Sequence, residues 1–63
     1  MLTSSQQFHT LLTARHFGGF FISKLADAGL AADSTNRVTL FAAFPTLETS
    51  YGPGTLLYTE DLG

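Results

Sequence analysis

Residues 8–30, FHTLLTARHFGGFFISKLADAGL, decide how the rest of this chain can fold. At about 100° per residue, this stretch is expected to form a helix with two apolar sides. The first stripe contains Phe8, Leu11, Leu12, Ile22, Leu25 and Ala26. The second lies roughly opposite and contains Phe17, Phe20, Phe21 and Ala28. Because one stripe is enough to pack a helix against its own chain, the second predicts burial against another surface.

The glycine pair Gly18-Gly19 lies in the middle of this stretch and admits two structures. Each glycine costs about 1 kcal/mol relative to alanine inside a helix. The pair can therefore break the stretch into one helix at 5–16 and another at 20–30, and the break can be the hinge of a helical hairpin. Alternatively the helix continues, and the missing side chains let another backbone approach. Both glycines lie on the Phe8 stripe, so we predict one long helix over about residues 5–28. Its expected N-cap is Ser4 or Ser5, and Gly29 is its expected C′ residue.

A second, shorter helix is predicted over about residues 34–51, with Asp33 or Ser34 as its N-cap. A β-strand at 37–44 is the competing prediction, because RVTLFAAF has some β-branched and aromatic character. Pro45 disfavours helix at the residue before it and can open a new helical turn. We therefore expect a kink and a short helix at about 46–51. One stripe would then run through both pieces: Arg37, Leu40, Phe41, Phe44, Leu47 and Tyr51. Residues 52–54, Gly-Pro-Gly, end the helix, and the tail after them is expected to be ordered against the helices.

Length and composition favour a single small helical domain over residues 1–63, with an all-α fold. A chain of this length buries only about 60% of its unfolded surface. It has no cysteine to form a disulfide or a thiolate metal site. Small domains without such crosslinks often oligomerise. Six phenylalanines and two tyrosines are a large aromatic load for so small a core, so we expect a homo-oligomer.

The charge balance argues against several partners. Only 13% of the residues are charged and the net charge is −2, with Arg15, Lys24 and Arg37 as the basic residues. Gripping a nucleic-acid backbone requires several such contacts, and docking on an anionic membrane requires a basic cluster. No segment reaches the roughly 18 apolar residues of a membrane span. No basic region precedes an apolar run near the N-terminus, so we expect a cytoplasmic protein without nucleic-acid or membrane partners.

No pattern for catalysis, a metal or a cofactor is found. His9 and His16 are separated by a helical rise of about 10 Å, too far to share a metal ion. The glycine-rich turn at 52–55 lacks the lysine of a phosphate-binding loop. The carboxylates are scattered, and nothing pairs a base with a nucleophile. We therefore expect neither an enzyme nor a cofactor.

Interaction residues are the remaining candidates. Arg15 is either a side chain with its guanidinium in water or an interface anchor, with Glu48, Glu60 or Asp61 as its expected partner. The cluster Phe17, Phe20 and Phe21 is either core under the second helix or an exposed aromatic patch that contacts another chain. The full set of candidates is Arg15, Phe17, Phe20, Phe21, Lys24, Arg37, Tyr51 and Tyr58.

The C-terminal half carries the pattern NRxxLxxAFPTLxxxYGPGTxxY at residues 36–58. This pattern resembles one that recurs in short bacteriophage accessory proteins. The resemblance implies a small protein that acts in the cytoplasm of a bacterial host, commonly by binding and blocking a host or defence factor. We therefore expect a non-enzymatic binding protein, an inhibitor or adaptor acting through protein contacts. The alternatives are an oligomeric protein that sequesters a small molecule such as a signalling nucleotide, and a structural or assembly component.

Overall fold

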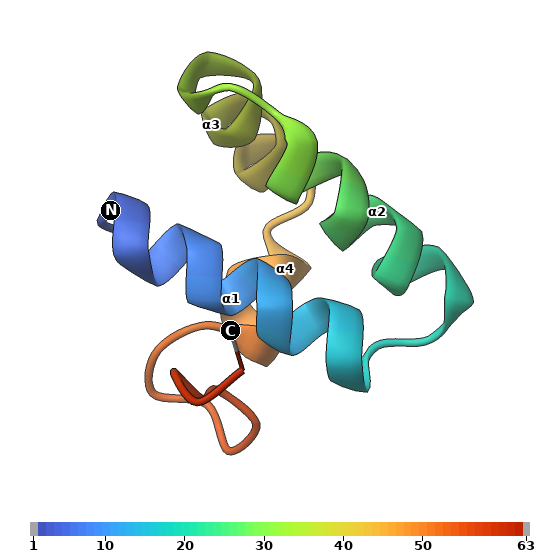
Figure 1. Cartoon of the computed structure of the whole chain (residues 1–63), viewed down its shortest axis with the longest axis vertical. Helices are drawn as coiled ribbons and strands as arrows, with labels where there is room; N and C mark the ends of the chain where they lie inside the picture. Colours follow the sequence, from blue (N-terminus) through green and yellow to red (C-terminus); the bar gives the residue numbers. More distant parts are fainter. Residues whose placement is uncertain (1, 63) are drawn as a thin grey trace.

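Four α-helices and an irregular tail make up the computed structural model of this chain, which describes residues 2–62 (Figure 1). The prediction of an all-α fold is confirmed, since no strand occurs in these residues and the segment that could have been a strand is helical up to Ala43. None of the described helices is long and apolar enough to cross a membrane. The helices are α1 (Ser4–Phe17), α2 (Phe20–Ala31), α3 (Ser34–Ala43) and α4 (Thr46–Tyr51).

The predicted continuous helix over residues 5–28 is wrong, because the chain leaves the helix at Gly18 and Gly19. Both glycines have extended backbone, and the Gly18 amide donates to the carbonyl of Ala14 at 2.8 Å, which ends α1. The chain then turns back, so that α2 packs along α1 as the second arm of a hairpin (Figure 1). Breaking the helix avoids the cost of two interior glycines and lets the two helices bury their apolar residues on each other.

Gly29 was expected just beyond the end of the first long helix, but it lies inside α2, which continues to Ala31. Gly29 is buried against Leu11 of α1: a Cβ atom built at Gly29 would lie 2.8 Å from the Leu11 Cδ2 atom. The close approach of the two helices at this point explains why a glycine is placed within a helix. The free energy gained by burying Leu11 offsets the cost of having a glycine inside a helix at position 29.

The helix caps agree with the sequence in one case and differ in another. Asp33 caps α3 as predicted, because its carboxylate accepts a hydrogen bond from the Asn36 amide at 2.8 Å. The N-cap of α1 is Thr3 rather than Ser4 or Ser5. The Thr3 hydroxyl accepts from the Gln6 amide at 3.1 Å, and the Gln6 side chain accepts from the Thr3 amide at 2.9 Å. This reciprocal pair satisfies two backbone donors, whereas a serine cap alone satisfies one.

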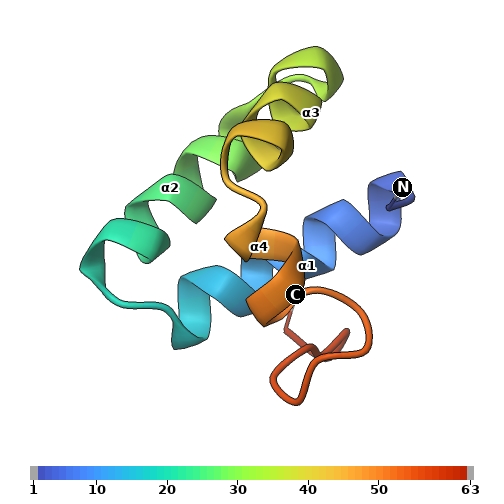
Figure 2. The same ribbon diagram turned by 180° about the vertical axis from the view of Figure 1, so that it is seen from behind.

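Pro45 divides α3 from α4 completely, so the predicted kinked helix with one continuous stripe is wrong. Phe44 leaves the helical conformation (φ −128°, ψ 72°), as expected of a residue before proline, and α4 starts again at Thr46. The two pieces then pack on different neighbours, α3 on α2 and α4 on α1 (Figure 2). The residues of the expected stripe are therefore shared between two separate contacts.

Helix α1 lies at the centre of the fold. Five consecutive residues, Thr10 to Ala14, are buried, so its middle is covered on all sides. Leu11 and Ala14 meet Ala26 of α2 and Leu47 of α4 in the core. The tail covers α1 from another direction, where the backbone amide of Thr59 donates to the Thr13 hydroxyl at 3.3 Å. The middle of α1, which belongs to the stretch that the sequence suggested as the organising element, is thus enclosed by its own chain.

Candidate functional site

Three phenylalanines from α2 and the α3–α4 junction remain exposed in the folded chain. The side chains of Phe20, Phe21 and Phe44 are 82%, 62% and 38% exposed. The rings of Phe21 and Phe44 meet edge to face, with their centroids 6.1 Å apart. We call Phe20, Phe21 and Phe44 the aromatic surface. It joins residues that lie more than twenty positions apart in the sequence.

The exposure of these rings does not result from a loosely folded chain. The accessible surface of the molecule is 3848 Å² for a mass of 6.8 kDa. A compact monomer of this mass is expected to expose about 3950 Å². At about 200 Å² per phenylalanine, the aromatic surface exposes roughly 350 Å² of ring side chains. This area is similar to that of the largest apolar patch on a typical monomer, which is often functional.

Lys24 gives the aromatic surface a positive charge at one edge. Its Nζ atom lies 5.6 Å from the centroid of the Phe20 ring, one helical turn away on α2. A cation over a ring face is weakly attracted in water and more strongly when a partner excludes the water. A partner that covers this edge would therefore strengthen the contact.

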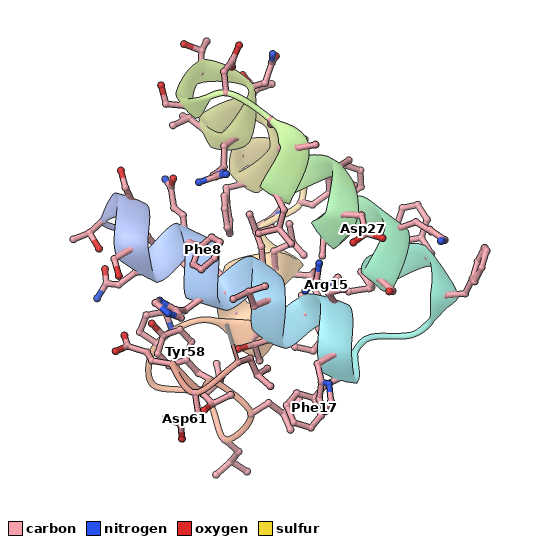
Figure 3. The ribbon with its side chains drawn as sticks, in the orientation of Figure 1. Phe8, Arg15, Phe17, Asp27, Tyr58 and Asp61 are labelled. Atoms are coloured by element: carbon pink, nitrogen blue, oxygen red, sulfur yellow. The ribbon has the colours of Figure 1, made fainter. Side chains whose placement is uncertain are left out.

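Phe17 does not belong to this surface, although the sequence grouped it with Phe20 and Phe21. It ends α1 before the glycine break, is 48% exposed, and packs edge to face on His16 with ring centroids 4.6 Å apart. Figure 3 places it on the tail side of α1. The third ring of the aromatic surface is instead Phe44, which sequence reasoning did not include among the interaction residues. Pro45 could have indicated it, because a proline turns the residue before it out of the helix.

The three cations do not converge on one site. Arg15 Nη1 lies 3.6 Å from Asp27 Oδ1, and the two side chains, each about half exposed, point toward one another from α1 and α2 (Figure 3). Within the chain the carboxylate beside Arg15 is therefore Asp27 rather than Glu48, Glu60 or Asp61, because the hairpin brings α2 closer. A partner of Arg15 in another chain stays a prediction. Arg37 donates to the carbonyls of Gly29 and Leu30, at 3.0 and 3.4 Å, and thereby satisfies the C-terminal end of α2.

A surface hollow of about 350 Å³ lies beside the end of α1 and is lined by Leu12, Arg15, His16 and Leu62. Arg15 is the one arginine or lysine in this lining, and Asp27 already pairs with it. A bound nucleotide usually needs several cations or a row of backbone amides around its phosphates. The lining of this hollow does not supply them.

The two predicted tyrosines lie away from the aromatic surface. Tyr51 is half-buried at the end of α4 and packs against the core. Tyr58 is in the tail, and its hydroxyl donates to Glu60 Oε2 at 2.7 Å. Burial, the hydrogen bond to Glu60 and the negative charge of Glu60 together raise the pKa of Tyr58 to about 12, and burial is the largest of these causes. This pair helps to fix the tail.

We predict that Tyr58 titrates well above an ordinary tyrosine. The variant Tyr51→Phe keeps Tyr58 as its single tyrosine. When this variant is titrated, the ultraviolet absorbance of tyrosinate should rise with a midpoint near pH 12. An unfolded tyrosine loses its proton near pH 10, so the unfolded chain releases protons first. The free energy of unfolding is therefore at its full value below pH 10 and falls between about pH 10 and 12.

Glu60→Gln in the Tyr51→Phe background is the matched variant. It removes the charge, so the midpoint should fall, but it should stay above 10 because burial is the largest cause. An unchanged midpoint would show that Glu60 has no influence on Tyr58. A midpoint near 10 before the substitution would contradict the buried, hydrogen-bonded tail.

The described residues also set limits on other kinds of site. Within residues 2–62, no group of three or more histidine, aspartate or glutamate side chains gathers where it can hold a metal ion. The exposed aromatic surface is therefore the feature with the clearest chemical meaning. Comparisons of this chain with protein-family models, with curated proteins and with solved structures found no match.

Proposed function

We propose that this chain is a small non-enzymatic binding protein that acts through protein–protein contacts at its aromatic surface. The observation that supports this proposal is the exposure of Phe20 and Phe21, adjacent in sequence, in a molecule of otherwise ordinary compactness. Aromatic side chains are enriched at the centres of protein interfaces, where they bury a large area at low entropic cost. Their exposure in the single chain leaves that free energy to be gained on binding.

The chemistry of the surface indicates what kind of partner fits. Three rings call for an apolar counterpart, and Lys24 at the edge favours a carboxylate next to it. Binding to a host or defence factor in a bacterial cytoplasm, as an inhibitor or adaptor, and assembly into a homo-oligomer are both parts of this proposal. Each requires that a second polypeptide covers Phe20 and Phe21.

Protein contact is favoured over sequestration of a nucleotide by the positions of the cations. Arg15 pairs with Asp27, Arg37 holds the end of α2, and Lys24 stacks on Phe20. These side chains are directed to three different places. A phosphate ligand would need them in one place.

Photo-crosslinking tests the proposal directly. p-Benzoylphenylalanine in place of Phe20 or Phe21 keeps an aromatic ring at the surface and should form covalent adducts with protein in bacterial cells. The control position is Thr49, which is exposed on α4 and lies outside the aromatic surface. We expect adducts from positions 20 and 21 and none from position 49. Failure to form adducts at positions 20 and 21 would overturn the proposal.

A second variant shows whether the surface itself drives the contact. With the crosslinker at position 21, Phe20→Asp should lower the adduct yield on the order of tenfold, because a buried aromatic anchor is replaced by a charge. The helical circular dichroism signal should be unchanged, since Phe20 is 82% exposed and supports no core. An unchanged yield would mean that the adducts report proximity alone.

A further inference from the structure

The exposed side of α2 carries an ordered pattern from one end to the other. Its first turn presents Phe20 and Phe21, and its last turns present Ala28 and Ala31. Between them lie a cation, Lys24, and an anion, Asp27. Phe20, Lys24, Asp27 and Ala31 recur at intervals of four, three and four residues, so they form one stripe along the helix. All of them are exposed.

This stripe is complementary to itself when a second helix runs antiparallel to the first. With the two helices centred between Lys24 and Asp27, Phe20 lies opposite Ala31 of the second copy, which leaves space for the ring. Lys24 then faces Asp27 of the second copy. A two-fold axis repeats both contacts, so large meets small twice and positive meets negative twice. Parallel helices would instead place Phe20 on Phe20 and Lys24 on Lys24.

We propose that a second copy of this chain occupies the aromatic surface, with the two α2 helices antiparallel, Phe20 over Ala31 and Lys24 facing Asp27. This inference rests on the proposed function in protein–protein contact and names the partner. The contact is closed, because the same face is used on both copies. It gives Phe20 an apolar counterpart and Lys24 a carboxylate without any other molecule.

The charges and the area are consistent with such a contact. Asp27 lies 3.6 Å from Arg15 of its own chain, yet its side chain stays 46% exposed and accessible to the second copy's Lys24. A standard interface buries about 800 Å² per partner. The aromatic surface provides roughly 350 Å² of this, and the rest of the α2 face has to provide the remainder. The small side chains of Ala28 and Ala31 permit the close helix spacing that this burial requires.

A charge swap tests the predicted pairing of Lys24 with Asp27. By sedimentation equilibrium, Lys24→Glu should raise the dimer Kd on the order of tenfold, because two attractive contacts become repulsive. Asp27→Lys should have a similar effect. The double variant Lys24→Glu/Asp27→Lys restores opposite charges and should return the Kd to within about threefold of the original chain. A double variant as weak as either single one, or an original chain that stays monomeric, would overturn the inference.

Crosslink mapping distinguishes the antiparallel arrangement from other contacts. Trypsin cuts after Arg15, Lys24 and Arg37, so Phe20 and Ala31 fall in different peptides, 16–24 and 25–37. In adducts of dimer mass formed from p-benzoylphenylalanine at position 20, we expect peptide 16–24 to be joined to peptide 25–37. Because the adduct has the mass of a dimer, its covalent link joins two copies. Phe20 and Ala31 lie about 16 Å apart along one helix, so a link between these two residues cannot form within one copy.

The remaining outcomes separate this inference from the proposed function. Dimer adducts that join peptide 16–24 to another peptide 16–24 would show a parallel contact and overturn the antiparallel dimer. Adducts with other proteins alone would also overturn it, while the proposed function in protein contact would stand. The absence of any protein adduct at position 20 would count against both.

Discussion

Leu47→Ala should remove a large fraction of the free energy of unfolding of this protein. Leu47 is the large buried side chain that α4 contributes to the core, where it contacts the α1 cluster around Leu11 and Ala14. Truncating a buried leucine to alanine costs about 2–5 kcal/mol. The whole chain is expected to be stable by only about 3–9 kcal/mol, given its 63 residues. Thermal unfolding followed by circular dichroism should show a Tm lower by on the order of 20 °C.

The effect of Leu47→Ala should exceed the loss of one contact, because α4 has no other means of staying in place. A helix of six residues is not stable in isolation. The tail that follows it is anchored on α1 through the backbone of Thr59 and the Thr13 hydroxyl. Releasing α4 therefore also releases the chain that leads to this anchor, and the middle of α1 becomes exposed to water.

Leu56→Ala is the matched control for Leu47→Ala. It makes the same truncation at a leucine that is fully exposed in the turn after α4. Surface substitutions of this kind change the free energy of unfolding by no more than about 0.5 kcal/mol. Equal losses at the two positions would contradict the placement of Leu47 in the core.

The parts of the fold that depend on neighbouring residues could be predicted from the sequence. Asp33 was recognisable as a cap because its carboxylate needs only the amide three residues later, and Pro45 ends α3 by a steric effect on Phe44. The burial of Thr10 and Thr13 could not be predicted. Both are 0% exposed, and Thr13 is covered because residues more than forty positions later cross α1. Nothing in the local pattern signals that contact.

The sequence predicted only part of the candidate site, because some of its residues are placed by contacts between distant segments. The second apolar stripe correctly indicated Phe20 and Phe21 as candidates for exposure, and the alternative that they form core under the second helix is wrong. Phe17 shared their stripe only while the helix was assumed to be continuous. Arg37 is a candidate interaction residue on sequence, and in the fold its guanidinium donates to a carbonyl that becomes its neighbour only after α2 and α3 pack together. Long-range packing decided each difference.

The glycine pair between α1 and α2 should respond unequally to the same substitution. Gly18→Ala is expected to destabilise the fold by about 1–3 kcal/mol, the usual cost of forcing a group into occupied space. A Cβ atom at Gly18 would lie 2.6 Å from the Ala14 carbonyl oxygen and 2.8 Å from the Ile22 Cβ atom. The carbonyl belongs to the backbone and accepts the hydrogen bond that ends α1, so it cannot move without weakening that bond.

Gly19→Ala is the matched control, and its effect should have the opposite sign. Apart from Gly19 itself and its two chain neighbours, no residue has an atom within 4 Å of a Cβ built at Gly19, and its extended backbone suits any residue. Alanine there restricts the unfolded chain and should stabilise the fold by about 0.4–1 kcal/mol. Urea unfolding of both variants measures the difference. Equal effects would mean that the hairpin turn is not packed as described. A gain at both positions would mean that residues 18 and 19 are helical, which would restore the single long helix.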